Sequence, residues 1–214
     1  MEELGRKSVD EFKQSDKFPI IVVLENIRSA YNVGSVFRTS DAFLIEAIYI
    51  VGYSAKPPHK EIKKTALGAE ETVIWKYFKT SAEAIDELKI RKYKVYAVEQ
   101  AEESYKLHSA NFRQNEKIAV VFGNEVTGVE QTTIHLCDGC IEIPQLGMKH
   151  SLNIATAAGI VLWELIRSKM PPAVKGRTEH LKPPVSAAAE ELRLEKQFFI
   201  MVKEMKFGYW ILNI

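Results

Sequence analysis

The stretch that decides the fold reads FPIIVVLENIRSAYNVGSVFRTSDAFLIEAIYIV and covers residues 18–51. It contains two runs of apolar and β-branched residues, 18–25 and 45–51, on either side of a helical pattern. Apolar runs of this continuity are typical of strands that are buried on both faces of a parallel sheet. The stretch therefore predicts a strand, a covering helix and a second strand.

The same alternation continues along the chain. Further strand-like runs lie at 72–78, 93–100, 117–123 and 140–144. Two further helices are predicted between and after them, one over 80–92 that opens with a capping box from Thr80 to Glu83, and a long one over 151–170 that starts at Ser151. These patterns predict an α/β fold, with a mostly parallel sheet of about six strands and flanking helices.

Composition restricts the class of protein. The chain has 214 residues, of which 46% are apolar and 27% charged, as expected for one globular domain with a proper core. Its longest apolar run, 152–166, is shorter than the ~20 residues that a bilayer span requires, and the N-terminus lacks an apolar targeting segment. Two cysteines cannot form a disulfide framework, so we expect a cytoplasmic protein that is not in a membrane.

Charge and proline distribution suggest the remaining organisation. The net charge of +1 does not indicate a polyanion partner, but basic residues cluster at 56–64 and 89–94, which leaves open a local basic face or simply a solvated one. Proline pairs at 171–172 and 183–184 delimit a polar stretch before another helical pattern. We expect three segments. They are an N-terminal arm (1–17), the main domain (18–169) and a C-terminal tail with an appended helix (170–214).

Because ligands bind beyond the carboxyl ends of strands in open parallel sheets, those ends are where we look for chemistry. After the first strand, Asn32 is placed to cap a helix that begins at Val33, which leaves Arg38 nearly opposite the apolar face. Asn32 and Gly34 would leave the first turn uncrowded, and free N–H groups there favour an anion such as an RNA phosphate. A capped helix with a solvated arginine is the alternative.

The strand at 117–123 ends in Gly123, which is followed by Glu125 and Gly128. Glycine after a strand allows close approach of the backbone to a ligand, and a carboxylate can accept hydrogen bonds or pair with a cation. The pattern is neither a phosphate loop of the Walker type nor a dinucleotide fingerprint.

The strand at 140–144 closes at Pro144 and leads through Gly147 to Ser151 and Asn153 at the predicted helix start. Proline and glycine fix a turn there, and the hydroxyl and amide side chains face the same crevice as the backbone amides of the loop. A cap on a buried helix explains the same residues without any ligand.

Together these three segments resemble, in order and spacing, the motifs of the SpoU-type RNA ribose 2′-O-methyltransferases of the SPOUT class, over residues 18–168. The first motif corresponds to Asn32, Gly34, Arg38, Asp41 and Ala42, the second to Gly123, Glu125 and Gly128, and the third to Ile143, Pro144, Gly147, Ser151, Leu152 and Asn153. The resemblance implies S-adenosylmethionine as methyl donor with S-adenosylhomocysteine as product, an RNA substrate, a homodimer and a C-terminal trefoil knot. It also implies the roles of individual residues. The catalytic set is Arg38, Asn32, Glu125, Ser151 and Asn153, and the cofactor-binding set is Gly123, Ile143, Pro144, Gly147 and Leu152.

Transfer of a methyl group from a sulfonium to a ribose hydroxyl is an in-line displacement in which the oxygen gains negative character. The enzyme must align the reactants and stabilise that charge, and no metal is needed. Arg38 is, by resemblance, the residue that meets the hydroxyl. Because a guanidinium is a poor base at neutral pH, we assign it charge stabilisation and expect a phosphate or water to take the proton.

Three other interpretations stay open. They are an RNA-binding module without catalysis, a SPOUT-class enzyme that methylates a base, and a Rossmann-like nucleotide binder. Only 17 residues precede the first strand, which favours transfer RNA over ribosomal RNA. His135, Cys137 and Cys140 resemble half of a zinc site, but no second ligand pair follows, so we predict no metal. We expect a surface role for His150 and a packing role for the aromatic residues at 207–213.

Overall fold

The computed structural model describes residues 9–101, 103–113, 115–148, 151–167 and 169–170. The chain divides into two compact units, 1–183 and 184–214, and every described residue belongs to the first. The predicted C-terminal helix and the aromatic residues at 207–213 therefore lie outside the described residues, as does His150. Within the described part of the chain, no helix is long and apolar enough to cross a membrane.

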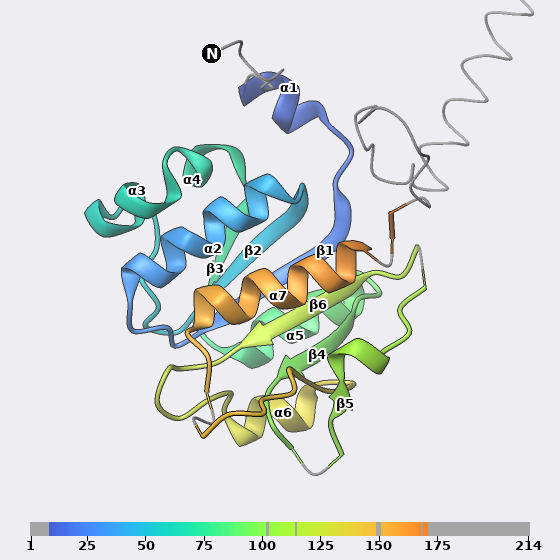
Figure 1. The fold of residues 1–214 in the computed structure, drawn as a ribbon. Helices are drawn as coiled ribbons and strands as arrows, with labels where there is room; N and C mark the ends of the chain where they lie inside the picture. Colours follow the sequence, from blue (N-terminus) through green and yellow to red (C-terminus); the bar gives the residue numbers. More distant parts are fainter. Residues whose placement is uncertain (1–8, 102, 114, 149–150, 168, 171–214) are drawn as a thin grey trace, which may run out of the picture. The chain divides into compact units, whose positions relative to one another are not determined.

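One parallel sheet forms the centre of this unit, and the prediction of an α/β fold is confirmed (Figure 1). Its neighbouring strands are all parallel and follow the order β3-β2-β1-β6-β4-β7-β5. The strands are β1 (Phe18–Glu25), β2 (Ile45–Val51), β3 (Trp75–Phe78), β4 (Lys94–Val98), β5 (Tyr105–Lys106), β6 (Ile118–Phe122) and β7 (Gly139–Glu142). Six of them match the predicted runs, and the two-residue β5 was not predicted.

Helices cover both faces of the sheet, as Figure 1 shows, with α2 and α7 on one side and α5 and α6 on the other. The helices are α1 (Val9–Gln14), α2 (Ala30–Ala42), α3 (Lys60–Ala66), α4 (Ala69–Thr72), α5 (Ser81–Ile90), α6 (Gln131–Leu136) and α7 (Ile154–Arg167), with a short 3₁₀ helix at Leu107–Ser109. Successive side chains of β1 alternate between the two cores. Ile20 and Val22 pack on the α2 side, whereas Ile21 and Val23 pack on the α5 side.

The cap by Thr80 that opens α5 is confirmed, whereas the returning bond to Glu83 comes from Lys79, the residue before the cap. The hydroxyl of Thr80 accepts the N–H of Glu83 at 3.3 Å, and the carboxylate of Glu83 accepts the N–H of Lys79 at 3.1 Å. Two other helix starts differ from the prediction, because α2 begins at Ala30 with Ser29 as its cap, and α7 begins at Ile154. Both corrections affect residues of the candidate site, Asn32 and Ser151.

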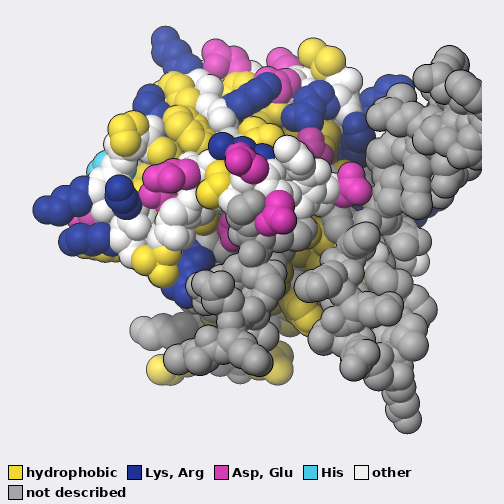
Figure 2. Space-filling model, turned by 90° about the horizontal axis from the view of Figure 1, so that it is seen from above, with side chains coloured by type: hydrophobic (Ala, Val, Ile, Leu, Met, Phe, Trp, Pro, Cys, Tyr) yellow, Lys and Arg dark blue, Asp and Glu magenta, His cyan; other side chains and the backbone are white. Residues whose placement is uncertain are grey.

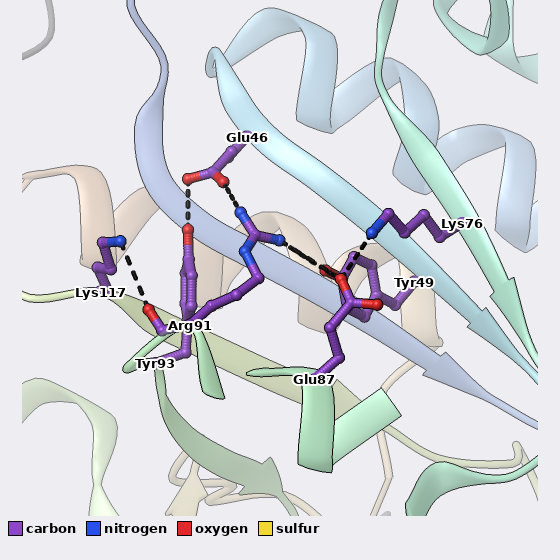
Figure 3. Close-up of polar contacts among 7 residues, drawn as sticks. All are labelled: Glu46, Tyr49, Lys76, Glu87, Arg91, Tyr93 and Lys117. Atoms are coloured by element: carbon purple, nitrogen blue, oxygen red, sulfur yellow. Dashed lines mark hydrogen bonds and ion pairs between the residues drawn. The ribbon is translucent and has the colours of Figure 1, made fainter. Parts of the chain in front are cut away.

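A polar network ties β2 to α5 on the second face of the sheet (Figure 3). Arg91, at the end of α5, lies between Glu46 and Tyr49. Its guanidinium donates a hydrogen bond of 2.6 Å to the hydroxyl of Tyr49. Tyr49 in turn donates to Glu87 at 2.6 Å, and Tyr93 donates to Glu46. Burial and the bond to Glu87 raise the pKa of Tyr49 to about 12. Burial and the bond to Glu46 likewise raise the pKa of Tyr93.

Candidate active site

A pocket of about 310 Å³ lies beyond the carboxyl ends of β4, β6 and β7. The segments that follow β6 and β7 form most of its wall, so the two strand ends chosen from the sequence do meet there. The lining residues are Val98, Glu99, Gln100, Phe122, Gly123, Asn124, Glu125, Val126, Thr127, Gly128, Glu142, Ile143, Gln145, Ser151, Leu152, Ile154 and Ala157. Of the five residues predicted to bind the cofactor, Gly123, Ile143 and Leu152 line the pocket, whereas Pro144 and Gly147 lie in the same loop without lining it.

The loop after β6 needs both of its glycines because its backbone folds onto itself. Asn124 and Gly128 exchange two backbone hydrogen bonds of 2.9 Å. A Cβ atom on Gly123 would lie 2.2 Å from the backbone of Gly128, and Gly128 itself has a φ of +72°. The close approach that the sequence suggested for a ligand at Gly123 is thus an approach of the loop to itself.

Asn124 is a site residue that sequence reasoning missed. It is buried, and its side-chain oxygen accepts the N–H groups of Val126 and Thr127 at 2.8 and 3.1 Å. Its amide donates to the carbonyl of Asn26 at 3.0 Å and to the hydroxyl of Tyr53 at 2.7 Å. The available signal was an asparagine directly after a strand-ending glycine, where such side chains commonly organise a turn.

Glu125 links this loop to the start of α2. Its carboxylate accepts the N–H groups of Arg28 at 3.0 Å and Ser29 at 3.3 Å, and the side-chain amide of Asn32 at 3.0 Å. Burial opposes ionisation of Glu125, but the hydrogen bonds from Arg28, Asn32 and Ser29 outweigh it, so the pKa of this carboxyl is lowered. Glu125 is therefore held as an oriented anion.

The beginning of α2 corrects one prediction. Ser29, not Asn32, caps the helix, and its hydroxyl accepts the N–H of Asn32 at 3.3 Å. The N–H of Val33, which we expected to be free for an RNA phosphate, instead donates to the carbonyl of Ser29 at 3.2 Å. The N–H groups just before the helix, those of Arg28 and Ser29, face an anion that the protein supplies itself, the carboxylate of Glu125. Asn32 lies in the first turn of the helix, where its side chain is free to bond across the site.

Asn153 completes a chain of three predicted catalytic residues. Its amide donates to the side-chain oxygen of Asn32 at 3.1 Å, and its own oxygen accepts the N–H of Ala155 at 2.9 Å, which caps α7. Ser151 precedes this cap instead of starting the helix, and it lines the pocket as an exposed residue. The structure thus brings Asn32, Glu125 and Asn153 together and places Ser151 beside them.

Arg38 lies elsewhere on α2. It is exposed on the side opposite the buried Val33 and Phe37, as the spacing predicted. It does not line the 310 Å³ pocket but a second hollow, between α2, α3 and α7. Within one chain, the hollow with Arg38 is therefore distinct from the pocket that Glu125 and Ser151 line, and neither Asn32 nor Asn153 is among the described residues that line either one.

The described residues contain no group of three or more His, Cys, Asp or Glu side chains that could hold a metal ion. His135 contacts the side-chain amide of Gln131 at 3.1 Å. The thiol of Cys137 donates to the carbonyl of Thr133, and burial raises the pKa of this thiol to about 12, so it is not poised to act as a thiolate ligand.

A parallel α/β sheet with a pocket beyond the carboxyl ends of its strands defines a ligand-binding α/β protein. The SpoU rRNA Methylase family model matches residues 19–163, and the chain belongs to this family. The tRNA (guanosine(18)-2′-O)-methyltransferase of Thermus thermophilus is 30% identical over 168 residues, which cover 78% of this chain and 84% of that protein. A 23S rRNA (guanosine-2′-O-)-methyltransferase of Vibrio vulnificus is 27% identical over 169 residues, covering 78% of this chain and 67% of that protein.

Solved structures agree with this assignment. The A. aeolicus TrmH/SpoU tRNA modifying enzyme has the same fold, with a TM-score of 0.69 at 23% identity, covering 91% of this chain and 94% of that one. An AdoMet-bound rRNA methyltransferase from Sinorhizobium meliloti superposes with a TM-score of 0.65 at 26% identity, covering 76% of this chain and 61% of that one.

Proposed function

We propose that the protein transfers a methyl group from S-adenosylmethionine to the 2′-hydroxyl of a ribose in structured RNA, either transfer RNA or ribosomal RNA. Family membership supports the reaction class, and the relatives named above act on ribose hydroxyls in both kinds of RNA. The observation that carries the proposal for this chain is the charge of its pocket.

Three carboxylates line the pocket, those of Glu99, Glu125 and Glu142, of which Glu142 is paired with Lys106, and its described lining residues include no Lys, Arg or His. A pocket of this sign suits a ligand with a sulfonium and an ammonium group, and it repels the phosphates of a dinucleotide or a nucleoside triphosphate. This argues against the Rossmann-like alternative.

The apolar part of the pocket suits the remainder of the cofactor. Val98, Phe122, Ile143 and Leu152 supply apolar surface against which an adenine ring can pack. Glu99 is oriented by hydrogen bonds from the N–H groups of Gln100 and Val129, at 3.0 and 3.1 Å. When bound there, S-adenosylmethionine supplies an electrophilic methyl group, and the chain needs no metal for this chemistry.

The chain's own residues then position the segments of the site and stabilise the charge on the ribose oxygen. We assign Asn32, Glu125 and Asn153 to holding the start of α2, the loop after β6 and the start of α7 in one arrangement, with Ser151 at the reacting end. Arg38 is the donor that we assign to the ribose oxygen as it gains negative charge. A phosphate or water takes the proton.

The location of Arg38 outside the pocket supports a homodimer. Since Arg38 does not line the pocket of its own chain, we propose that it faces the pocket of a second copy. A stripe on α7, spaced like one helix face, offers a contact surface. Its members are exposed: Thr156, Ile160, Trp163 and Arg167. Cytoplasmic placement is part of the proposal and is supported by Cys137 and Cys140, which are both free thiols.

Mass spectrometry of RNA nucleosides tests the proposal directly. Total transfer RNA and ribosomal RNA from cells with and without the gene should differ by one 2′-O-methylated nucleoside, and purified protein should restore it with S-adenosylmethionine. A missing base-methylated nucleoside would instead favour the base-modifying alternative. Absence of S-adenosylmethionine binding in calorimetry at millimolar ligand, with RNA binding retained, would leave a non-catalytic RNA-binding module.

A further inference from the structure

The hollow that contains Arg38 has a composition unlike that of the pocket. It measures about 430 Å³ and lies between α2, α3 and α7. Its lining residues are Ser35, Arg38, Thr39, Lys64, Thr65, Ala155 and Thr156. Two cations and four hydroxyl-bearing side chains thus surround it, and the described residues that line it include neither a carboxylate nor a large apolar side chain.

The packing of α3 on α2 fixes Lys64 beside Arg38. A Cβ atom on Gly34 would lie 2.1 Å from the hydroxyl of Thr65 and 2.5 Å from the carbonyl of Ile62, so the two helices touch at this glycine. The hydroxyl of Thr65 also donates to the carbonyl of Tyr31 at 3.0 Å. Lys64, next in sequence to Thr65, is carried to the hollow by this contact.

Within the described part of the chain neither Arg38 nor Lys64 forms an ion pair, although the ammonium of Lys64 lies over the ring of Tyr31, 6.0 Å from its centroid. Some other exposed lysines do form ion pairs, Lys76 with Glu87 at 2.7 Å and Lys94 with Glu116 at 2.9 Å. Figure 2 shows Lys and Arg side chains over this face of the molecule, including the end where α3 lies. Two like charges at one hollow repel each other, and an anion between them removes that repulsion.

We propose that this hollow holds a backbone phosphate of the RNA strand beside the ribose that is methylated, and that Lys64 is the positioning residue that binds it. The inference rests on the proposed function, and it adds a residue outside the three segments that resemble the family motifs. With the phosphate on Lys64, an ammonium that acts as a point charge, the planar guanidinium of Arg38 is left to meet the ribose oxygen.

Lys63 offers a matched control, because it is the same residue type, exposed on the same helix, and does not line the hollow. Lys64→Ala, Lys64→Arg and Lys63→Ala are compared in single-turnover methyl transfer at saturating S-adenosylmethionine. The probe is bulk transfer RNA, or bulk ribosomal RNA if that is the acceptor, from cells lacking the gene. Lys64→Ala should raise the half-saturating RNA concentration about tenfold, the usual cost of one charge-assisted contact, and lower the plateau rate much less.

Lys64→Arg should restore most of the affinity, and Lys63→Ala should stay close to the parent protein. The salt dependence of RNA binding gives a second readout that a structural role would not move. For Lys64→Ala, the slope of log affinity against log salt should become shallower by about 0.7 to 0.9, the value for one lost phosphate contact. Equal behaviour of Lys64→Ala and Lys63→Ala in both measurements would overturn the inference.

The two proposals fail in different ways. A parent protein that binds RNA but transfers no methyl group to either bulk RNA would refute the proposed function. The salt slope would still decide whether Lys64 contacts a phosphate. A parent protein without RNA binding would overturn both. Thermal unfolding of Lys64→Ala should match that of Lys63→Ala, because both side chains are exposed.

Discussion

Glu125 connects two segments that lie 97 residues apart in the chain, from Arg28 to the loop after β6. A carboxylate after a strand-ending glycine could be recognised as a site residue from the sequence alone. Its partners could not, because nothing local in the sequence shows which distant N–H groups a carboxylate will accept. The same limit explains why Asn32 was wrongly predicted to be the cap. Serine and asparagine both cap helices well. In the structure Ser29 caps α2, and the side-chain amide of Asn32 donates to the distant Glu125.

Replacing Arg38 should lower the activity of the protein without lowering its stability. We expect Arg38→Ala to abolish methyl transfer, because removing a donor aimed at developing charge typically costs ~10²–10³ in rate and RNA positioning is lost as well. The free energy of unfolding should change by less than about 0.5 kcal/mol, since the side chain is exposed and leaves no cavity. Single-turnover kinetics at saturating S-adenosylmethionine, together with urea unfolding, measure the two effects.

Arg38→Lys is the control for geometry. It keeps the charge but loses the planar fork, so it should stay severely impaired because the ribose oxygen then lacks the directed donors of the guanidinium. An Arg38→Ala protein that transfers methyl groups within about tenfold of the parent rate would contradict the assigned role.

At the scale of elements, Gly34 has a different role from the predicted one, because it allows α2 and α3 to pack closely. The sequence suggested that this glycine leaves room for an anion, whereas the structure uses the space for α3. Periodicity predicts which helix face is buried, and the burial of Val33, Val36 and Phe37 confirms it. It does not predict which neighbouring helix will cover a glycine. The two-residue β5 was missed for a related reason, because it is too short to carry a pattern.

Gly34→Ala should therefore be destabilising although alanine is the better helix former. The added methyl group would meet backbone atoms of α3, and overpacking of this kind costs about 1–3 kcal/mol. Gly159→Ala on α7 is the matched control, since a Cβ atom there has nothing within 4 Å, and it should stabilise by roughly 0.5–1 kcal/mol. Urea unfolding of the two variants should shift the midpoint in opposite directions. A shift in the same direction would contradict the close contact at Gly34.

The polar network between β2 and α5 predicts a loss of stability at alkaline pH. Tyrosine in the unfolded chain ionises near pH 10, whereas Tyr49 in the folded chain resists ionisation up to about pH 12. The folded state thus holds its proton where the unfolded state has lost it, so the free energy of unfolding is unaffected below pH 10 and falls as the pH rises from 10 to 12. Tyr49→Phe should cost about 0.5–1.5 kcal/mol at neutral pH and flatten this fall.

Denaturant unfolding between pH 7 and 12 measures both effects. Tyr77→Phe serves as the control, because Tyr77 is an exposed tyrosine on β3 that lies outside the network. An alkaline limb that is equally steep in Tyr49→Phe and in the parent protein would contradict the role given to Tyr49.

For the whole molecule, the parallel sheet and the carboxyl edge at which the site forms followed from the continuous apolar runs, since such runs pair in parallel and need helices on both faces. The strand order could not be predicted, because β1 and β6 are neighbours in the sheet although β2, β3, β4 and β5 lie between them in the sequence. The trefoil knot and the dimer stay predictions, as do the boundaries of the main domain at residues 18 and 169.

The proposed dimer can be tested at Trp163, which is 49% exposed and packs against Phe43 with ring centroids 6.1 Å apart. Trp163→Glu places a charge in the stripe on α7 and should convert the dimer into monomers at micromolar concentration, as light scattering would show. Methyl transfer should fall with it, while S-adenosylmethionine binding persists. Ile90→Glu is the control, because Ile90 is 81% exposed on α5, on the other face of the sheet. Equal masses for Trp163→Glu and the parent protein would place the contact elsewhere.

The two edge strands of the sheet affect which surfaces are open to contact with another copy of the protein. In the described part of the chain, β3 and β5 form the borders of the sheet, and they are only four and two residues long. Each carries a lysine held by a carboxylate, Lys76 by Glu87 and Lys106 by Glu142. Short borders that present a charged side chain are poor templates for another strand. The sheet is thereby protected against edge-to-edge aggregation, which leaves the helical layer for the dimer contact that we propose.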